Sequence, residues 1–371
     1  MQQILTASAD YVELDEYFVQ SGAKSILLVC DSAFGFLRIK DYFETLEARK
    51  GIRVVKFSDF QPNPLYESVV KGVEIFHENN CGLIAAVGGG SAIDVAKCIK
   101  LYSNMDSSEN YLRQQIVPND VPLFAVPTTA GTGSEATRYA VIYYNGAKQS
   151  VTDYSCIPST VLFDASALKT LPVYQKKATM MDALCHAIES FWSVNSNAES
   201  MGYSQQAIEM IVANKARYLA NEDAGNENML KAANIAGKAI NITQTTAGHA
   251  MCYKLTSLYG IAHGHAAALC DKALIPFMMQ HPEACIDPRG EQHLKQVLGK
   301  IAAAFGCKPE ALAECFAALV DSLELPVPEV KSPEDIDILK TSVNPDRLKN
   351  HPVRLTVETI ESLYKQILRQ E

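Results

Sequence analysis

The sequence predicts a doubly wound α/β domain followed by an all-α domain. In the first half, short apolar runs alternate with amphipathic segments, and in the second half helical patterns follow one another without strand signals. Near-continuous apolar strands separated by helices are typical of a parallel sheet covered on both faces. We therefore predict an α/β domain over residues 1–173 and an all-helical domain over residues 174–371, with the boundary near Lys169–Lys176.

Individual elements follow from the same patterns. Apolar runs bounded by turn residues predict strands at Ser25–Asp31, Ile52–Phe57, Gly82–Gly90 and Pro122–Ala130. Helical spacing between these runs predicts helices at Leu65–Asn79 and Ser91–Tyr102. In the second half it predicts helices at Met180–Trp192, Glu199–Asn214, Asn228–Ala239, Gln292–Phe305 and Pro309–Leu323.

The composition excludes several classes of protein. Apolar residues make up 48% of the 371 residues and charged residues 20%, as in an ordinary globular protein. The net charge of −9 argues against a nucleic-acid surface, and neither a signal peptide nor an apolar run long enough to span a bilayer is present. The ten cysteines are scattered without a CxxC pair, which favours reduced thiols. We expect a cytoplasmic protein without nucleic-acid or membrane partners.

Three glycines join a predicted strand to a predicted helix in AAVGGGSAIDVAK (Ala85–Lys97). Glycines let the backbone approach a ligand closely, and the first N–H groups of the helix suit a pyrophosphate. The run matches neither the GxGxxG fingerprint nor the P-loop. Three consecutive glycines, followed by Ser91 and Asp94 in the first helical turn, favour an anion site over a simple tight turn.

Two other strand ends carry polar residues. VPTTAGTGSEAT (Val126–Thr137) ends a strand with hydroxyl residues and glycines, which suit a ligand loop and a solvated turn equally well. Asp31 ends the strand LLVCD, where a carboxylate can accept ribose hydroxyls or cap a helix, and position alone favours the cap. Ligands of open α/β sheets bind beyond the carboxyl ends of the strands, so these loops can face one crevice.

Histidines and an aspartate form a candidate metal site in the second half. Asp182 and His186 are four residues apart in MMDALCHAIESFW, so they share one helix face. The stretch GHAMCYKLTSLYGIAHGH holds three of the eight histidines, His249, His263 and His265, of which His265 is the weakest candidate. A buried core histidine is the commoner role for each alone, but both patterns together favour an Asp-His-His-His site. Such ligands suit iron(II), zinc, manganese or cobalt, which can polarise a carbonyl.

Taken together, these motifs resemble the iron-containing (group III) alcohol dehydrogenase family. GGGSAIDVAK, PTTAGTGSEAT, DALCHAIES and the H-x13-H-G spacing occur in the family's order and span nearly the whole chain. The resemblance implies an N-terminal nucleotide-binding domain, a C-terminal helical domain and a cleft between them. It also implies NAD(H) and a divalent metal, Fe2+ in preference to Zn2+ or Mn2+, and a homodimer or larger homo-oligomer.

The resemblance also implies roles for individual residues. The metal ligands would be Asp182, His186, His249 and His263. The cofactor would contact Asp31, Asn63, Gly89, Gly90, Ser91, Asp94, Thr128, Thr129, Thr132 and Lys148. At Asp31 the resemblance replaces the cap interpretation with a cofactor contact. An acidic residue at this position favours NAD over NADP.

The chain departs from the family pattern beside the third ligand. Many members carry a histidine four residues after that ligand, where this chain has Tyr253. A tyrosine with an ordinary pKa near 10 is a poor proton shuttle, so we expect this candidate catalytic residue to shape the pocket. Lys254 and Arg138 add positive charge that would suit an anionic substrate tail. The run YKLTSLYGIAHGHA is similar to the phosphonoacetaldehyde reductase branch.

We therefore expect a metal-dependent, NAD(H)-linked alcohol dehydrogenase that works as an aldehyde reductase on a small anionic aldehyde such as phosphonoacetaldehyde. The alternatives are a general short-chain alcohol, diol or glycerol dehydrogenase, a dehydroquinate-synthase-like lyase, and a non-catalytic nucleotide-binding protein. The lyase requires more basic residues around its cleft than the sequence offers. Glycerol enzymes typically use fewer metal ligands.

Overall fold

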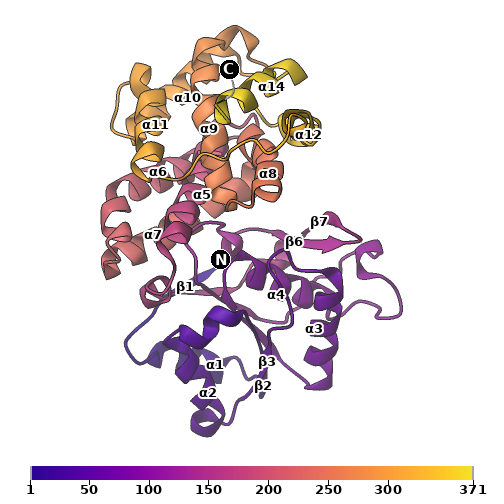
Figure 1. Ribbon diagram of the computed structural model, residues 1–371. Helices are drawn as coiled ribbons and strands as arrows, with labels where there is room; N and C mark the ends of the chain where they lie inside the picture. The colour runs from indigo at the N-terminus through magenta and orange to yellow at the C-terminus, as the bar shows by residue number, and fades with distance from the viewer. Residues whose placement is uncertain (1, 370–371) are drawn as a thin grey trace. The chain divides into compact units, whose positions relative to one another are not determined.

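The computed structural model describes residues 2–369, which divide into two compact units. Among these residues, the first unit comprises 2–171 and Asn221–Asn234, and the second comprises Pro172–Ala220 and 235–369. The first is an α/β unit and the second is built from helices (Figure 1). The helix Asp223–Thr243 contributes its first residues to the first unit and the remainder to the second. The predicted fold class is confirmed.

A six-stranded parallel sheet forms the first unit, in the order β1-β8-β5-β4-β2-β3. Its strands are β1 Gln3–Thr6, β2 Ser25–Cys30, β3 Arg53–Phe57, β4 Leu83–Gly88, β5 Leu123–Pro127 and β8 Thr160–Phe163. Every residue of β2, β4 and β5 is buried, which explains why these strands read as unbroken apolar runs. All four predicted strands are present.

Helices cover both faces of the sheet (Figure 1). The covering helices are α1 Val12–Gln20, α2 Ile39–Lys50, α3 Tyr66–Glu78 and α4 Gly90–Tyr102. Successive strand residues point to opposite faces, so Leu27 and Val29 join the core under α3 and α4. Ile26 and Leu28 join the core under α1 and α2. The helices after β2 and β4 therefore leave toward opposite faces, and the loops after these two strands diverge.

Several elements of the first unit were not predicted individually from the sequence, namely the strands β1, β6, β7 and β8 and the helices α1 and α2. A hairpin of β6 (Tyr139–Tyr144) and β7 (Ala147–Thr152) forms a separate antiparallel pair. Its turn residues Asn145 and Gly146 both have positive φ, 50° and 74°, so the Asn-Gly dipeptide was a readable hairpin signal. The edge strand β1 is only four residues long, and three of its four residues are exposed, so it lacks the long apolar run of a buried strand.

Helices make up the second unit. They are α5 Val173–Trp192, α6 Ala198–Leu219, α7 Asp223–Thr243, α8 Ala247–Tyr259, α9 His263–Gln280, α10 Glu291–Ala304, α11 Leu312–Ser322, α12 Asp335–Thr341, α13 Pro345–Leu348 and α14 Val357–Ile367. Buried α5 packs against α6, α9 and α10. Each predicted helix is present, but α5 begins seven residues earlier than expected, and Pro309–Ala311 is a 3-10 turn before α11. Within residues 2–369, strand pairing in this unit is limited to a bridge between Cys285 and Val353.

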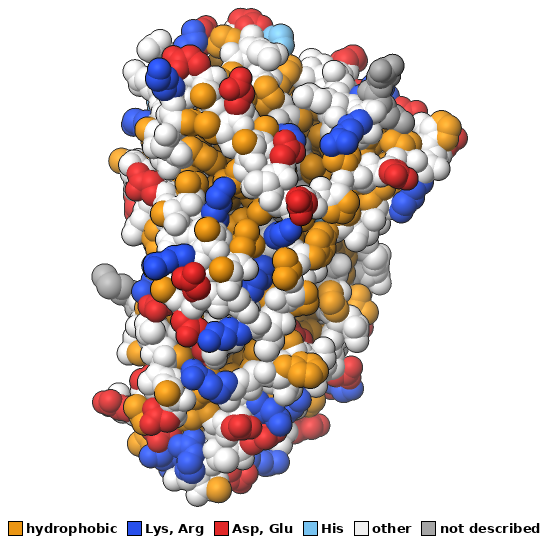
Figure 2. Space-filling model, turned by 60° about the vertical axis from the view of Figure 1, so that its left-hand side comes forward, with side chains coloured by type: hydrophobic (Ala, Val, Ile, Leu, Met, Phe, Trp, Pro, Cys, Tyr) orange, Lys and Arg blue, Asp and Glu red, His pale blue; other side chains and the backbone are white. Residues whose placement is uncertain are grey.

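The surface mixes charges of both signs. On the face drawn in Figure 2, Lys and Arg side chains alternate with Asp and Glu, and apolar side chains are scattered among them. This face therefore offers no broad basic patch of the kind that binds nucleic acid. None of the described helices combines the length and apolar character needed to cross a membrane.

Candidate metal centre and nucleotide site

Three of the predicted metal ligands meet in the second unit. Asp182 lies on α5, His249 in the first turn of α8 and His263 at the start of α9, and one ligand atom of each lies within 4.8 Å of the others. Oδ1 of Asp182 and Nε2 of His249 face each other at 3.6 Å. Both atoms are buried, and neither has a hydrogen-bond partner among the described residues. A cation would satisfy both atoms, so the donor set fits a divalent metal ion.

His186, the fourth predicted ligand, lies beside this cluster. It follows Asp182 by one turn of α5 and is 7% exposed. Its ring stacks on that of His249 with centroids 4.4 Å apart and planes 14° apart. The structure therefore brings His186 to the cluster, although its ring nitrogens fall outside the group of atoms that lie within 4.8 Å of one another.

Gly264 allows α9 to approach α5. A Cβ atom at this position would lie 2.0 Å from the carbonyl oxygen of Ala178 and 2.5 Å from Cβ of Asp182. Such contacts are too short for any side chain, so only glycine fits between the two helices. Because His263 directly precedes this glycine, the close approach sets the distance between His263 and Asp182.

Tyr174 fixes the start of α9 from another direction. Its hydroxyl accepts the backbone N–H of Ala262 at 2.9 Å and lies 3.1 Å from Nδ1 of His265. His265 is fully buried, and burial lowers its pKa to about 4. This histidine therefore sits in the helix packing, outside the ligand cluster.

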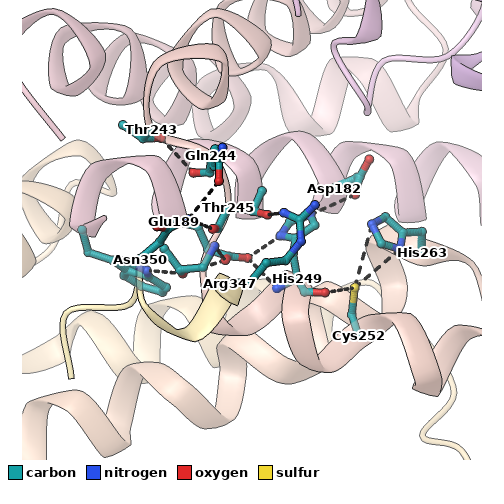
Figure 3. A network of polar contacts seen from close by, with 12 residues as sticks. Asp182, Glu189, Thr243, Gln244, Thr245, His249, Cys252, His263, Arg347 and Asn350 are labelled. Carbon is teal, nitrogen blue, oxygen red and sulfur yellow. Dashed lines mark hydrogen bonds and ion pairs between the residues drawn. The ribbon is translucent and has the colours of Figure 1, made fainter. Parts of the chain in front are cut away.

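Glu189, which sequence reasoning missed, orients His249 (Figure 3). Its Oε1 accepts the backbone N–H of His249 at 3.0 Å and makes a short hydrogen bond with Nδ1 of the ring. Its Oε2 accepts the backbone N–H and the hydroxyl of Thr246 at 2.6 and 2.7 Å. Because Nδ1 is held by a carboxylate, Nε2 is left to face Asp182. A readable signal existed, since Glu189 follows Asp182 by seven residues and so shares its face of α5.

Both carboxylates of the cluster are ionised near neutral pH. Burial alone would raise their pKa values. The imidazoles of His186, His249 and His263 outweigh burial and hold the pKa of Asp182 below its ordinary value. His249 and the hydrogen bonds from Thr246 do the same for Glu189. Burial opposes but does not prevent a rise in the pKa of His249 to about 10 beside these carboxylates, so a metal ion competes with a proton at this ring.

Tyr253 covers one side of the cluster. Its ring stacks on the imidazole of His263 with centroids 5.2 Å apart and planes 29° apart. Burial raises the pKa of Tyr253, with the guanidinium of Arg347 opposing the rise. A raised pKa makes the phenol a poorer proton donor, which supports the expectation that this side chain shapes the pocket.

The predicted cofactor residues gather at strand ends in the first unit. The carbonyl of Gly88 accepts the backbone N–H of Thr128 at 3.1 Å, joining the loops after β4 and β5. A Cβ on Gly89 would lie 3.4 Å from Cγ2 of Thr129, and one on Gly90 would lie 3.0 Å from Cγ2 of Thr132. The two loops therefore face each other closely, and side chains on the glycines would fill the space between them.

Asp31 belongs to the same cluster of strand ends. Its Oδ1 accepts the backbone N–H of Ala33 at 2.9 Å and caps the 3-10 helix Ser32–Phe36. A Cβ on Gly88 would lie 3.1 Å from its Oδ2, so the other carboxylate oxygen borders the glycine loop. The cap and the cofactor role are thus compatible. The loops after β2 and β4 diverge at this point, which is where open α/β sheets bind ligands.

The remaining predicted cofactor residues have different surroundings. Ser91 lies half-buried in the first turn of α4, three residues before Asp94. Both oxygens of Asp94 are used within the protein, by the hydroxyl of Ser134 at 2.6 Å and the backbone N–H of Val141 at 3.0 Å. Asn63, at a φ of 60°, and Lys148, on β7, are exposed.

The two predicted substrate cations lie in different units. In the first, the guanidinium of Arg138 lies over the rings of Tyr139 and Tyr154, 5.0 and 4.8 Å from their centroids. In the second, Lys254 follows Tyr253 on α8 and is half-buried. Arg138 is thus held by aromatic partners, whereas the Lys254 ammonium has no ion pair among residues 2–369.

A parallel sheet with a glycine-rich loop at its carboxyl edge, together with a helical unit that carries an aspartate–histidine cluster, is the combination expected of a nucleotide-binding, metal-dependent enzyme. Comparisons with known families agree. Residues 2–165 match a profile described as iron-containing alcohol dehydrogenase, and residues 176–368 match the profile of that family's C-terminal region. The chain belongs to the iron-containing alcohol dehydrogenase family.

Individual relatives cover from two thirds of the chain to almost all of it. Alcohol dehydrogenase 4 of Schizosaccharomyces pombe is 30% identical over 370 residues, which cover 93% of this chain and 82% of the relative. The 1,3-propanediol dehydrogenase of Citrobacter freundii is 34% identical over 67% of this chain and 66% of its own. Among solved structures, sulfoacetaldehyde reductase from Bifidobacterium kashiwanohense in complex with NAD+ has a TM-score of 0.87 at 25% identity, covering 100% of this chain and 98% of its own.

Proposed function

We propose that this protein is a metal-dependent, NAD(H)-linked alcohol dehydrogenase that works mainly as an aldehyde reductase. One observation carries the proposal: Oδ1 of Asp182 and Nε2 of His249 face each other, buried and without hydrogen-bond partners among the described residues, next to His263. Family membership makes iron(II) the first choice of metal, and zinc or manganese suit the same ligands. The NAD+ complex of the sulfoacetaldehyde reductase supports NAD(H) as the cofactor.

Each group of residues has a defined task in this proposal. Asp182, His186, His249 and His263 hold the metal, which when bound polarises the substrate's carbonyl oxygen. Glu189 keeps Nδ1 of His249 occupied, so that Nε2 faces the metal position.

In the first unit, the backbone of the glycine loop and the N-terminal end of α4 bind the pyrophosphate, which suits the N–H groups there. The proposed cofactor contacts are Asn63, Gly89, Gly90, Ser91, Asp94, Thr128, Thr129, Thr132 and Lys148. Asp31 accepts ribose hydroxyls and repels a 2′-phosphate, which favours NAD over NADP.

For the substrate we propose a small anionic aldehyde such as phosphonoacetaldehyde. Support comes from the sulfoacetaldehyde reductase, whose substrate carries a comparable anionic tail, and from the cations Arg138 and Lys254. A second candidate is a short-chain alcohol or diol, which the 34% identity to a 1,3-propanediol dehydrogenase favours. We further propose a cytoplasmic homodimer or larger homo-oligomer, on the scattered unpaired cysteines and the family resemblance.

The test is NADH oxidation by iron(II)-reconstituted protein with phosphonoacetaldehyde or propanal at equal concentration. We expect turnover of both and a preference for the phosphonate. A preference for propanal contradicts the anionic substrate and supports the second candidate. No turnover of either aldehyde by protein that binds NAD overturns the dehydrogenase proposal in favour of a lyase or a non-catalytic protein. In the control variant His263→Ala, turnover should vanish while NAD binding persists.

A further inference from the structure

Arg347 is a cation beside the metal cluster that the sequence motifs did not reveal. It lies on the short helix α13, which packs against α8. Its Nη1 donates a hydrogen bond to the hydroxyl of Thr245, and its guanidinium carbon lies 5.5 Å from the centroid of the Tyr253 ring. The Tyr253 ring stacks in turn on His263. A guanidinium, an aromatic ring and a candidate metal ligand therefore follow one another. Figure 3 shows Arg347 beside Thr245 in the polar network around His249.

The contacts of Arg347 leave its charge unpaired. A guanidinium carries five N–H donors, and no carboxylate of residues 2–369 lies within ion-pair distance of this one. Arg289, another arginine of the same unit, shows the contrast. Its Nε and Nη2 bond to both carboxylate oxygens of Asp287 at 2.9 and 2.7 Å, and its other donors bind Ser193 and Ser196. The N–H donors of Arg289 are used by hydrogen bonds within the protein, whereas the charge of Arg347 has no carboxylate partner among residues 2–369 and is available to a ligand.

The charge of Arg347 favours an anionic ligand. No carboxylate of residues 2–369 pairs with its guanidinium, so a substrate with a negative tail can neutralise this charge.

Arg347 also gives a reason for the tyrosine at position 253. An aromatic face attracts a guanidinium, and a phenol stays neutral at physiological pH. A histidine at this position would be protonated part of the time and would then repel Arg347. Tyrosine in place of the family's histidine at position 253 is therefore compatible with the cation Arg347 over the same ring.

We propose that Arg347 binds the oxyanion tail of the substrate and so determines the preference for anionic over neutral aldehydes. The inference rests on the proposed function of this site as a metal-dependent aldehyde reductase. The planar fork of a guanidinium matches two oxygens of a phosphonate or sulfonate. Thr245 and Tyr253 position the fork, through one hydrogen bond and one ring face.

The test compares kcat/KM of the iron-loaded wild type with that of Arg347→Gln and Arg347→Lys, on phosphonoacetaldehyde, sulfoacetaldehyde and propanal. We expect Arg347→Gln to lose about 10- to 100-fold on the anionic aldehydes, mainly through KM, and less than about threefold on propanal. Arg347→Lys should recover part of the loss, and the two anions show which oxyanion is preferred. Equal losses on all three substrates, or an unchanged preference for anions, overturn the proposal.

Lys349→Ala is the matched control. Lys349 lies two residues away, is exposed and is paired with Asp346, so its removal changes the net charge equally without touching the cluster. We expect this variant to keep the wild-type preference. A loss of preference equal to that of Arg347→Gln would mean that general charge, and not Arg347, selects the substrate.

A binding measurement separates this inference from the proposed function. Methylphosphonate cannot be reduced, so its Kd for the metal-loaded protein reports anion binding without turnover. We expect Arg347→Gln to weaken the Kd at least tenfold, and an unchanged Kd overturns the role of Arg347. Failure of the wild type to reduce any aldehyde overturns the dehydrogenase instead.

Discussion

The two candidate sites are built in different ways. The nucleotide site of the first unit is mostly backbone: glycines and strand ends bring Asp31, Thr129 and Thr132 together. The metal cluster of the second unit is made of side chains from three helices, held by Glu189 and by the close approach at Gly264. A site built from backbone groups is encoded by residues that are adjacent in the sequence. A site built from side chains depends on how helices from distant parts of the sequence cross. Substitutions in the second site should therefore have the larger effects.

The largest effect is expected for Gly264→Ala. The added Cβ would meet a backbone carbonyl at 2.0 Å, so α9 must move away from α5 and carry His263 with it. We expect loss of metal, measured as metal content after reconstitution, and destabilisation of about 1–3 kcal/mol in chemical unfolding.

The control for this change is Gly202→Ala on α6. A Cβ there has no atom within 4 Å, so it should leave metal content unchanged and stabilise the helix slightly. Full metal content in a folded Gly264→Ala protein would contradict the argument from close approach.

The next effect is expected for Glu189→Gln. An amide cannot accept hydrogen bonds at both of its terminal atoms, so the ring of His249 loses its fixed tautomer and Thr246 loses an acceptor. We expect metal affinity, measured by chelator competition, to fall about 10- to 100-fold. Glu209→Gln, at an exposed position on α6, should leave it unchanged. Equal affinities of both variants would make Glu189 a packing residue only.

A smaller effect is expected for Asp31→Ser. Serine preserves the cap of Ser32–Phe36, so the change removes the carboxylate without removing the acceptor of the Ala33 N–H. We expect the ratio of kcat/KM for NADH over NADPH to fall about tenfold. If the ratio stays constant, Asp31 serves only as the cap.

The smallest effect concerns His351, which is fully buried and has no hydrogen-bond partner for either ring nitrogen among residues 2–369. Burial lowers its pKa to about 4, whereas the unfolded chain takes up a proton near 6.5. Between these values the unfolded state binds more protons, so stability falls as the pH falls from 6.5 toward 4. From pH 7.5 to 5.5, metal-free wild type should lose about 1 kcal/mol more than His351→Leu in urea unfolding. Parallel pH profiles would contradict this.

The difference between the sites also explains what the sequence could predict. The strands β2, β4 and β5 are buried on both faces, so their apolar runs are visible without tertiary information. β1 is a short edge strand whose pairing with β8 comes from a partner more than 150 residues away, which no local pattern encodes. The hairpin of β6 and β7 was readable from Asn145-Gly146.

Within the metal cluster, the local pair Asp182 and His186 was readable because one helix holds both. Glu189 lies on the same face, but its partner His249 is 60 residues away, so its role follows only from the crossing of α5 and α8. Arg347 lies still farther from its partners, on a short helix next to Thr245 and Tyr253. The candidate ligands could therefore be proposed from local motifs, whereas the contacts that position them depend on how the helices cross.

The carboxylate of Glu189 has one more consequence. It accepts the N–H groups of Thr246 and His249 and so satisfies two backbone donors at the start of α8, whose N-cap residue makes no side-chain cap of its own. The same carboxylate thus stabilises the start of α8 and orients the imidazole of His249. The contacts that start α8 therefore also orient the ring of His249. A metal ion would bind an imidazole that is already ordered, so binding would cost little further conformational entropy.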